Sequence, residues 1–466
     1  MDDAAFDRGR PPGPPRLPVL GNTHQYVRDP LGFFVETARE YGPVAYYDLG
    51  GEAFYQLSDP DHVERVLVHE NESYVKGELF QDSLRPPLGN GLLTNEGDAW
   101  RRQRHRIQPA FTPDRLAAYA TVMVDLTERR IADWDDGEPI DLHEEMMRLT
   151  VEIAAKALFD VDVRTSKAAI GGALEAVMDQ VERHTRRPVD VPSWAPTPGN
   201  RQYARALATL DAVADRIIDE RRSQQRGDSR GARSNGDDGS PDGDADDDTH
   251  EPGDVVTLLL DAGVSREQIR DEVVTILLAG HETTALALTY ALHLLASNPD
   301  AWKPLREELD DVLADGPPAA SDLPALAYTE RVVKETMRVH PPVYELLRES
   351  IEDVVFDGYR IPAGNTIAVQ QWVIHRDPAN YDEPSTFRPD RWTPEFERSL
   401  PRFAYFPFGG GPRRCIGDRF AMQEAQLVLA TICRRWTFES KTEPLSFSPS
   451  ITLRPSGPVE MVPRRR

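Results

Sequence analysis

The chain is poor in cysteine, and its first residues lack the features of an export signal. Cys415 and Cys433 are the only cysteines in 466 residues. Two cysteines cannot build a disulfide framework, so we expect a protein of the reducing cytoplasm. The first residues do not show the basic, apolar and small-residue order of a signal peptide, and we expect no transmembrane anchor ahead of the fold.

Lysine is also scarce, and carboxylates dominate the charge. Only six of the 54 basic residues are lysine, and the 78 acidic residues leave a net charge of −24. Carboxylates keep a chain hydrated when salt screens ordinary charge effects, which predicts a halophilic source such as a haloarchaeon. Such acidity repels phosphate backbones, so we expect no nucleic-acid partner. Residues 101–106 are locally rich in positive charge. This basic stretch is either a plain basic surface or a docking patch for an acidic electron carrier.

No internal linker separates two apolar regions, so we expect one domain over residues 1–466. Residues 1–20 are rich in proline and predict an extended segment. Two β-rich runs on either side of Gly50 and Gly51 predict a hairpin. Residues 222–253 contain almost no apolar side chain, which predicts a disordered acidic insertion. Most of the remaining periodicity is helical, so the fold class is mainly α with a smaller β-rich region.

The longest apolar element, residues 269–296, would span about 42 Å as a helix. That length suits a membrane span. However, Gly280, His281, Glu282, Thr283 and Thr284 lie in its middle, where polar groups are costly in lipid. We therefore expect a buried core helix that crosses a ligand pocket.

Cys415 lies in a glycine-rich loop that leads into an apolar helical pattern. This arrangement suits a haem iron held by one thiolate. Residues 409–411 are all glycine and are expected to adopt backbone conformations closed to other residues, as is Gly417. The helix N-terminus, Arg413 and Arg414 are expected to favour the thiolate. An inert thiol or another metal site is the alternative, but no second cysteine or histidine stands nearby at ligand spacing.

The pattern formed by Phe408, Gly411, Cys415 and Gly417 resembles the haem-ligand loop of the cytochrome P-450 family. The resemblance extends from Pro11 to the C-terminus, apart from the acidic insertion. It implies a single-domain cytochrome P-450 fold with haem b buried between the long helix and the cysteine loop. Cys415 would be the metal ligand, and its thiolate the axial ligand of the haem iron.

Within the long helix, the run from Ala279 to Thr284 is similar to the family's oxygen-activation motif. The resemblance implies that Ala279 and Gly280 leave room above the iron. Thr283 would hold water there, and Glu282 would relay protons towards it. A zinc helix of the His-Glu-x-x-His type is excluded, because position 285 is alanine.

Other matches are similar to the family's supporting residues. The expected haem-propionate contacts are Trp100, Arg104, Arg348 and Arg413. An expected structural triad, which would lock the segment before the haem loop, consists of Glu335, Arg338 and Arg391. The expected substrate-pocket residues are Phe80, Val343, Tyr344 and Leu346.

The resemblance implies a monooxygenase that inserts one atom of dioxygen into an apolar organic substrate. A separate ferredoxin- or flavodoxin-type protein would supply the electrons, and we expect a monomer. Three alternatives stay open. A peroxygenase or isomerase of the same fold would tend to lack the pair Glu282 and Thr283. A haem-based gas or ligand sensor would bind without steady substrate-dependent use of NAD(P)H. An electron-transfer haem protein would fill both axial positions of the iron, whereas the small residues Ala279 and Gly280 would leave one open.

Overall fold

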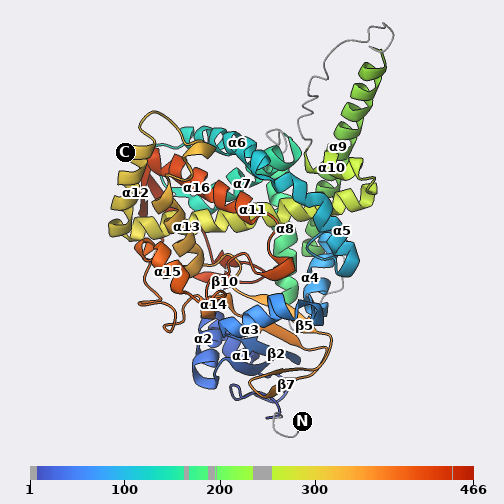
Figure 1. The fold of residues 1–466 in the computed structure, drawn as a ribbon, viewed down its shortest axis with the longest axis vertical. Coiled ribbons are helices and arrows are strands. Elements are labelled where there is room, and N and C mark those ends of the chain that lie inside the picture. The colour runs from blue at the N-terminus through green and yellow to red at the C-terminus, as the bar shows by residue number, and fades with distance from the viewer. Residues whose placement is uncertain (1–7, 162–166, 187–194, 196, 235–253, 443) are drawn as a thin grey trace.

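The computed structural model describes residues 8–161, 167–186, 195, 197–234, 254–442 and 444–466. The fold is mainly helical, with a smaller β-rich part, as the sequence predicts. Figure 1 shows the helices gathered towards one end of the molecule and the main sheet at the end that carries the N-terminus. Three clusters of buried apolar side chains form the core, and the largest lies among the helices.

The helices have the following bounds: α1 Thr23–Arg28, α2 Pro30–Tyr41, α3 Pro60–Glu64, α4 Glu78–Leu88, α5 Gly97–Ile107, α6 Pro113–Ala132, α7 Leu142–Phe159, α8 Lys167–Arg186, α9 Pro198–Ser234, α10 Val255–Asp261, α11 Arg266–Ser297, α12 Pro299–Val312, α13 Ala327–Val339, α14 Gln371–Ile374, α15 Pro394–Ser399 and α16 Asp418–Arg435.

The strands have the following bounds: β1 Val44–Leu49, β2 Glu52–Leu57, β3 Tyr74–Val75, β4 Ile140–Asp141, β5 Leu346–Ser350, β6 Val354–Phe356, β7 Tyr359–Ile361, β8 Thr366–Val369, β9 Trp436–Ser440, β10 Phe447–Pro449, β11 Leu453–Pro455 and β12 Glu460–Arg465. The main sheet has the order β1-β2-β8-β5-β3. Its β2–β8 pair is parallel, and Tyr55 stands opposite Ile367 there. The predicted hairpin is confirmed as the antiparallel pair β1–β2.

The predicted long helix is confirmed as α11, which spans 32 residues. Ser265 caps its N-terminus by accepting a hydrogen bond from the amide of Gln268. It is the helix, among the described residues, whose length and apolarity would allow a membrane crossing, but 83% of its most apolar window is buried inside the protein. Because α7 and α16 pack against it, α11 is a core helix.

Two segments are expected from the sequence to lack helices and strands, and the structure describes part of each. The prediction of a disordered insertion from residue 222 is wrong at its start, because α9 continues to Ser234; residues 235–253 lie outside the described part. In the proline-rich segment, Pro12 accepts a hydrogen bond from the amide of Tyr46 on β1. A Cβ on Gly13 would lie 1.7 Å from the Tyr46 carbonyl oxygen, so the segment runs directly along the sheet edge. Residues 1–7 of it lie outside the described part.

Candidate functional site

The Cys415 side chain is exposed, yet burial raises the pKa of its thiol. Both observations hold when a sulfur is accessible but surrounded by protein on most sides. The amide of Gly417 and the charges of Arg104 and Arg414 oppose the rise, and Asp418 adds to it. The expectation that the helix end and the arginines favour the thiolate is confirmed for the Gly417 amide and for Arg414, while Arg413 is not among the causes of the shift. Desolvation nevertheless outweighs these groups, so the pKa of the free thiol is raised overall.

The glycines of this loop have different physical roles. Gly409 and Gly411 have φ of +68° and +63°, a region that favours glycine. A Cβ on Gly411 would also lie 1.8 Å from the Leu67 carbonyl oxygen. The expectation is wrong for Gly410, whose φ of −159° is extended, and for Gly417, whose φ is −95°. Inside the loop, the Cys415 amide donates to the carbonyl of Phe408 over 3.0 Å, which fixes the cysteine.

One turn of α11 is accessible and forms an opening in an otherwise buried stretch of the helix. Between Asp271 and Leu295, the only residues that are not buried are Ala279, Gly280 and Thr283. These three positions share one helix face. A Cβ on Gly280 would meet only the Ala154 Cβ within 4.0 Å, so space remains there. Since α11 packs on α16, the helix that follows Cys415, the opening and the thiol belong to neighbouring elements.

Thr283 and Glu282 have opposite environments. The Thr283 hydroxyl lies at the opening and donates to the Ala279 carbonyl over 3.0 Å. Glu282 is 2% exposed and accepts hydrogen bonds from Thr452 and Arg454, both over 2.6 Å. Burial alone would raise the pKa of Glu282, but the charge and hydrogen bond of Arg454 lower it overall. The structure therefore does not bring Glu282 beside Thr283 in the opening but turns it towards β11.

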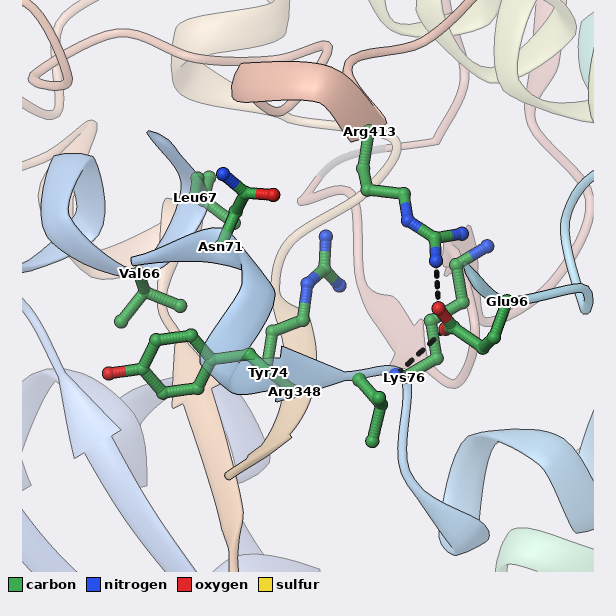
Figure 2. Close-up of a pocket in the computed structure, with 9 residues that line it drawn as sticks. Val66, Leu67, Asn71, Tyr74, Lys76, Glu96, Arg348 and Arg413 are labelled. Carbon is green, nitrogen blue, oxygen red and sulfur yellow. Dashed lines mark hydrogen bonds and ion pairs between the residues drawn. The ribbon is translucent and has the colours of Figure 1, made fainter. Parts of the chain in front are cut away.

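Three cations converge on a small pocket next to the cysteine loop. Arg348 on β5, Arg413 and Lys76 line it together with Glu96 (Figure 2). Arg413 donates to the Asn95 carbonyl over 2.9 Å and forms an ion pair with Glu96. Burial lowers the pKa of Arg348 and of Arg413 to about 10 each, and it lowers the pKa of Lys76 well below its usual value. Within the described residues, neither Arg348 nor Lys76 forms an ion pair with a carboxylate.

Helix α5 supplies the other predicted contacts of this region. Trp100 is buried, and the Arg413 guanidinium lies 4.0 Å from the centroid of its ring. Arg104 donates to the Arg414 carbonyl over 2.8 Å, and burial lowers the pKa of Arg104. The structure thus brings Trp100, Arg104, Arg348 and Arg413 together around the cysteine loop.

These residues fit a haem. Arg348, Arg413 and Lys76 carry three positive charges against the one carboxylate of Glu96. Buried charge is costly unless it is paired, and the two propionates of a haem would neutralise the excess. Sequence reasoning missed Lys76 and Glu96. The sequence offers two weak signals for Lys76. Lysine is rare in this chain, with six in all, and Lys76 directly follows the strand-forming residues Tyr74 and Val75.

Glu335 is the centre of a buried polar network. Arg338 donates to both of its carboxylate oxygens over 2.8 Å, and Arg391 donates to one over 2.9 Å. The Trp392 indole adds a fourth hydrogen bond to Glu335 over 2.9 Å. Arg338 also donates to the Pro384 carbonyl, in the segment that leads towards the haem loop. The three predicted residues therefore meet, and they tie α13 to that segment.

The predicted pocket residues do not all face one space. Phe80, Val343 and Leu346 are half-buried, as residues lining an internal space would be. Tyr344 is 2% exposed, and its hydroxyl donates to the Ser450 carbonyl over 2.7 Å. The expectation that Tyr344 faces the substrate is therefore wrong. It packs in the cluster with Phe34, because neighbouring residues of an extended segment point in opposite directions.

Comparison with known proteins agrees with this geometry. The family model described as Cytochrome P450 matches residues 11–461. "Cyclooctatin synthase" of Streptomyces melanosporofaciens is 37% identical over 97% of this chain and 95% of its own length. "Cyclooctat-9-en-7-ol 5-monooxygenase" of the same organism is 34% identical, with 91% and 88% covered. "Pentalenene oxygenase" of Streptomyces avermitilis is 34% identical, with 94% and 92% covered.

Proposed function

Because the chain belongs to the cytochrome P450 family, we propose that it inserts one oxygen atom of dioxygen into a terpenoid. The chain is a monooxygenase for an apolar organic substrate. The observation that carries the function is the accessible Cys415 thiol, which precedes α16, together with the packing of α16 on the core helix α11 that is accessible at Ala279, Gly280 and Thr283. The terpenoid class is supported by similarity over about nine tenths of the chain to "Cyclooctat-9-en-7-ol 5-monooxygenase" and "Pentalenene oxygenase".

We propose haem b as the cofactor, held by the Cys415 thiolate. Trp100, Arg104, Arg348, Arg413 and Lys76 would hold its propionates. A bound haem with a thiolate ligand supplies the redox chemistry that activates dioxygen. The Phe408–Cys415 hydrogen bond orients the sulfur, and the positive φ of Gly411 lets the loop approach Leu67.

Proton supply is the task proposed for Thr283 and Glu282. The Thr283 hydroxyl donates to the Ala279 carbonyl, so its lone pairs remain to accept a hydrogen bond from water in the opening. Glu282 is held as a carboxylate by Arg454. Before it can deliver a proton to the Thr283 side, it must exchange this contact for water. The strength of the ion pair between Arg454 and Glu282 thus sets how readily Glu282 delivers a proton.

Phe80, Val343 and Leu346 are proposed to contact the substrate. They are apolar and half-buried, and an apolar wall with few polar groups suits a hydrocarbon skeleton. Desolvating such a substrate would supply about 25 cal/mol per Å² of buried apolar surface.

The test is a visible absorption titration of the haem-loaded protein with a terpenoid panel and a fatty-acid panel. A thiolate-type spectrum that shifts to high spin with terpenoids alone supports the proposal, and a shift with fatty acids alone contradicts the substrate class. The Cys415→Ala variant should lose the thiolate spectrum. The matched Cys433→Ala variant should keep it, because Cys433 is buried within α16.

We further propose a monomeric, cytoplasmic protein that takes electrons from a separate ferredoxin- or flavodoxin-type donor. Arg102 and Arg106 are exposed on α5, the helix that also carries Trp100 and Arg104. A negatively charged donor would dock there. In the Arg102→Gln/Arg106→Gln variant, the donor concentration needed for half-maximal reduction should rise at low ionic strength. An unchanged value would place the docking surface elsewhere.

We also propose that the protein is adapted to salt, as the net charge of −24 suggests. Mutual repulsion of carboxylates weakens as salt screens it. The thermal midpoint and haem retention should therefore fall when salt is removed by dialysis. Full stability in dilute buffer would contradict a halophilic source.

A further inference from the structure

The loop between α4 and α5, residues 89–96, lies directly against α11. A Cβ on Gly89 would lie 2.3 Å from a carboxylate oxygen of Asp271. A Cβ on Gly91 would lie 2.0 Å from the hydroxyl oxygen of Thr275. Both glycines therefore let the backbone of this loop approach the helix more closely than any side chain would allow.

Three neighbouring side chains of α11 hold the loop by its backbone. Asp271 accepts a hydrogen bond from the Asn90 amide over 2.8 Å, and Glu272 accepts one from the Leu92 amide over 2.9 Å. Gln268, one turn earlier, donates to the Asn90 carbonyl over 2.8 Å and to the Glu272 carboxylate over 3.1 Å. We call Gln268, Asp271 and Glu272 the clasp, because each of them bonds the loop.

Glu272 lacks the cation that a buried carboxylate needs. It is 0% exposed, and within the described residues it forms no ion pair. The neighbouring Arg270 guanidinium is turned to other carboxylates, with ion pairs of 2.9 Å to Asp271 and 2.5 Å to Asp211. An ionised Glu272 would therefore be a buried charge beside a second carboxylate, which is costly.

The same surroundings decide the charge state of Glu272. Burial and the charge of Asp271 raise its pKa to about 7, although the hydrogen bonds from Leu92 and Gln268 oppose the rise. The other charged groups around the loop are not among the causes of this shift: Arg270 and Asp211 beside the clasp, Arg85 on α4, and Lys76 and Glu96 at the far end of the loop.

We propose that the clasp depends on a proton: protonated Glu272 holds residues 89–96 on α11, and loss of its proton opens the loop. In the open loop Glu272 is in water, with the ordinary carboxyl pKa of about 4.3. Opening therefore releases a proton wherever Glu272 is protonated in the closed loop. The closed loop is most stable below about pH 4.3, and it loses this stabilisation as pH rises to about 7.

Opening of the loop would also disturb the cation pocket of Figure 2. The Leu93 carbonyl accepts a hydrogen bond from the Lys76 ammonium, and the Asn95 carbonyl accepts one from Arg413 over 2.9 Å. The Lys76 amide donates to the Glu96 carboxylate over 3.0 Å. Glu272 is thus a positioning residue for these cations. The clasp needs neither haem nor turnover, so its failure would leave the proposed oxygenation untouched.

The test is hydrogen exchange of the full chain, followed by mass spectrometry on peptides that cover residues 89–96. After correction for the intrinsic exchange rate, protection of these amides should fall by roughly tenfold per pH unit up to about pH 7 and then level off. Protection of α16 should not follow. In Glu272→Gln, the side-chain oxygen still accepts from the Leu92 amide but cannot ionise, so loop protection should stay high at every pH.

Two further variants separate the clasp from general effects. Asp271→Asn removes the charge that helps to raise the pKa of Glu272, so protection should level off at a lower pH. Glu267 is exposed on the same helix, and Glu267→Gln should leave the pH dependence unchanged.

Three outcomes would overturn the proposal: loop protection in the wild-type protein that does not change with pH, the same change in Glu272→Gln, or an equal loss of protection in α16, which would mean global unfolding. An unchanged thermal midpoint at about pH 5 would verify that Glu272→Gln is folded. If it does not fold, Asp271→Asn decides, because an unchanged levelling point there contradicts the proposal.

Discussion

The Arg454 guanidinium donates a hydrogen bond of 2.6 Å to the Glu282 carboxylate. The side chain of Glu282 is 2% exposed and that of Arg454 13%, so the pair is largely removed from water. The contact joins α11 to β11, two elements that are 172 residues apart in sequence. It also fixes the direction of the acidic group proposed to supply protons. Arg454 is therefore a positioning residue for Glu282.

Replacing Arg454 with glutamine should reverse the effect of Glu282 on stability. In the wild-type protein the pKa of Glu282 is lowered, so the pair stabilises the fold above the ordinary carboxyl pKa of about 4.3 and this contribution is lost as pH falls further. Without Arg454, burial raises the pKa, and ionised Glu282 destabilises the fold as pH rises. We expect a loss of about 3–5 kcal/mol at neutral pH, measured by urea unfolding.

The double variant Arg454→Gln/Glu282→Gln serves as the control. Removing both charges should restore most of the stability at neutral pH and remove the part of its pH dependence that comes from Glu282, because neither member of this buried pair is then charged. If Arg454→Gln alone unfolds at the same urea concentration at about pH 5 and about pH 8, the pair does not hold Glu282 as a carboxylate.

Replacing Thr283 with alanine should uncouple electron consumption from product formation. The Thr283 hydroxyl lies in the opening of α11, where it is placed to hold water. We expect product per electron to fall by up to about 100-fold, which is the lower end of what positioned proton transfer typically contributes, with hydrogen peroxide released instead. The measurement is the ratio of product to NAD(P)H consumed in a reconstituted system.

Two variants test the specificity of that effect. Thr283→Ser keeps a hydroxyl and should retain most of the coupling. Thr289→Ala removes a buried hydroxyl that donates to the Ala285 carbonyl further along the same helix, and it should leave coupling unchanged. Equal coupling in Thr283→Ala and the wild-type protein would remove Thr283 from the proton supply.

Replacing Lys76 or Arg348 with glutamine should weaken haem retention. Both cations are surrounded by protein and form no ion pair within the described residues, so a propionate is their best counter-ion. A hydrogen bond to a charged group contributes about 1.5–3 kcal/mol, which corresponds to haem loss roughly 10- to 100-fold faster. The measurement is transfer of haem to apomyoglobin, followed in the visible spectrum.

The control for this experiment is Arg101→Gln. Arg101 forms ion pairs with Glu72 and Asp98, and all three side chains are more than half exposed. Surface pairs contribute little, so haem loss should match the wild-type rate. If Lys76→Gln and Arg348→Gln also match it, the pocket in Figure 2 does not hold the propionates.

Replacing Glu335 with glutamine should destabilise the fold strongly. Arg338 and Arg391 would keep buried guanidinium groups without a carboxylate, which costs about 3–5 kcal/mol. The matched variant is Glu395→Gln, whose partner Arg398 is exposed, and its cost should stay below about 1 kcal/mol. Thermal midpoints compare the two. Similar midpoints would show that the buried network does not hold the segment before the haem loop.

The sequence determined those features that depend on local pattern. The apolar run of α11, the β1–β2 hairpin and the glycine-rich loop around Cys415 could all be predicted, because each follows from short-range periodicity or from a spaced motif. The triad of Glu335, Arg338 and Arg391 was predicted through family resemblance rather than through physics. The same resemblance placed Tyr344 in the substrate pocket wrongly, since it does not specify which way one side chain of an extended segment points.

Only the tertiary structure decided which distant groups share a buried space. Arg454 meets Glu282, and Lys76 meets Arg348, because separate elements pack together and leave their charges with few alternative partners. It also decided the sign of the shift in the Cys415 pKa. Helix ends and neighbouring arginines can be read along the chain, whereas desolvation depends on what the whole fold places around the sulfur.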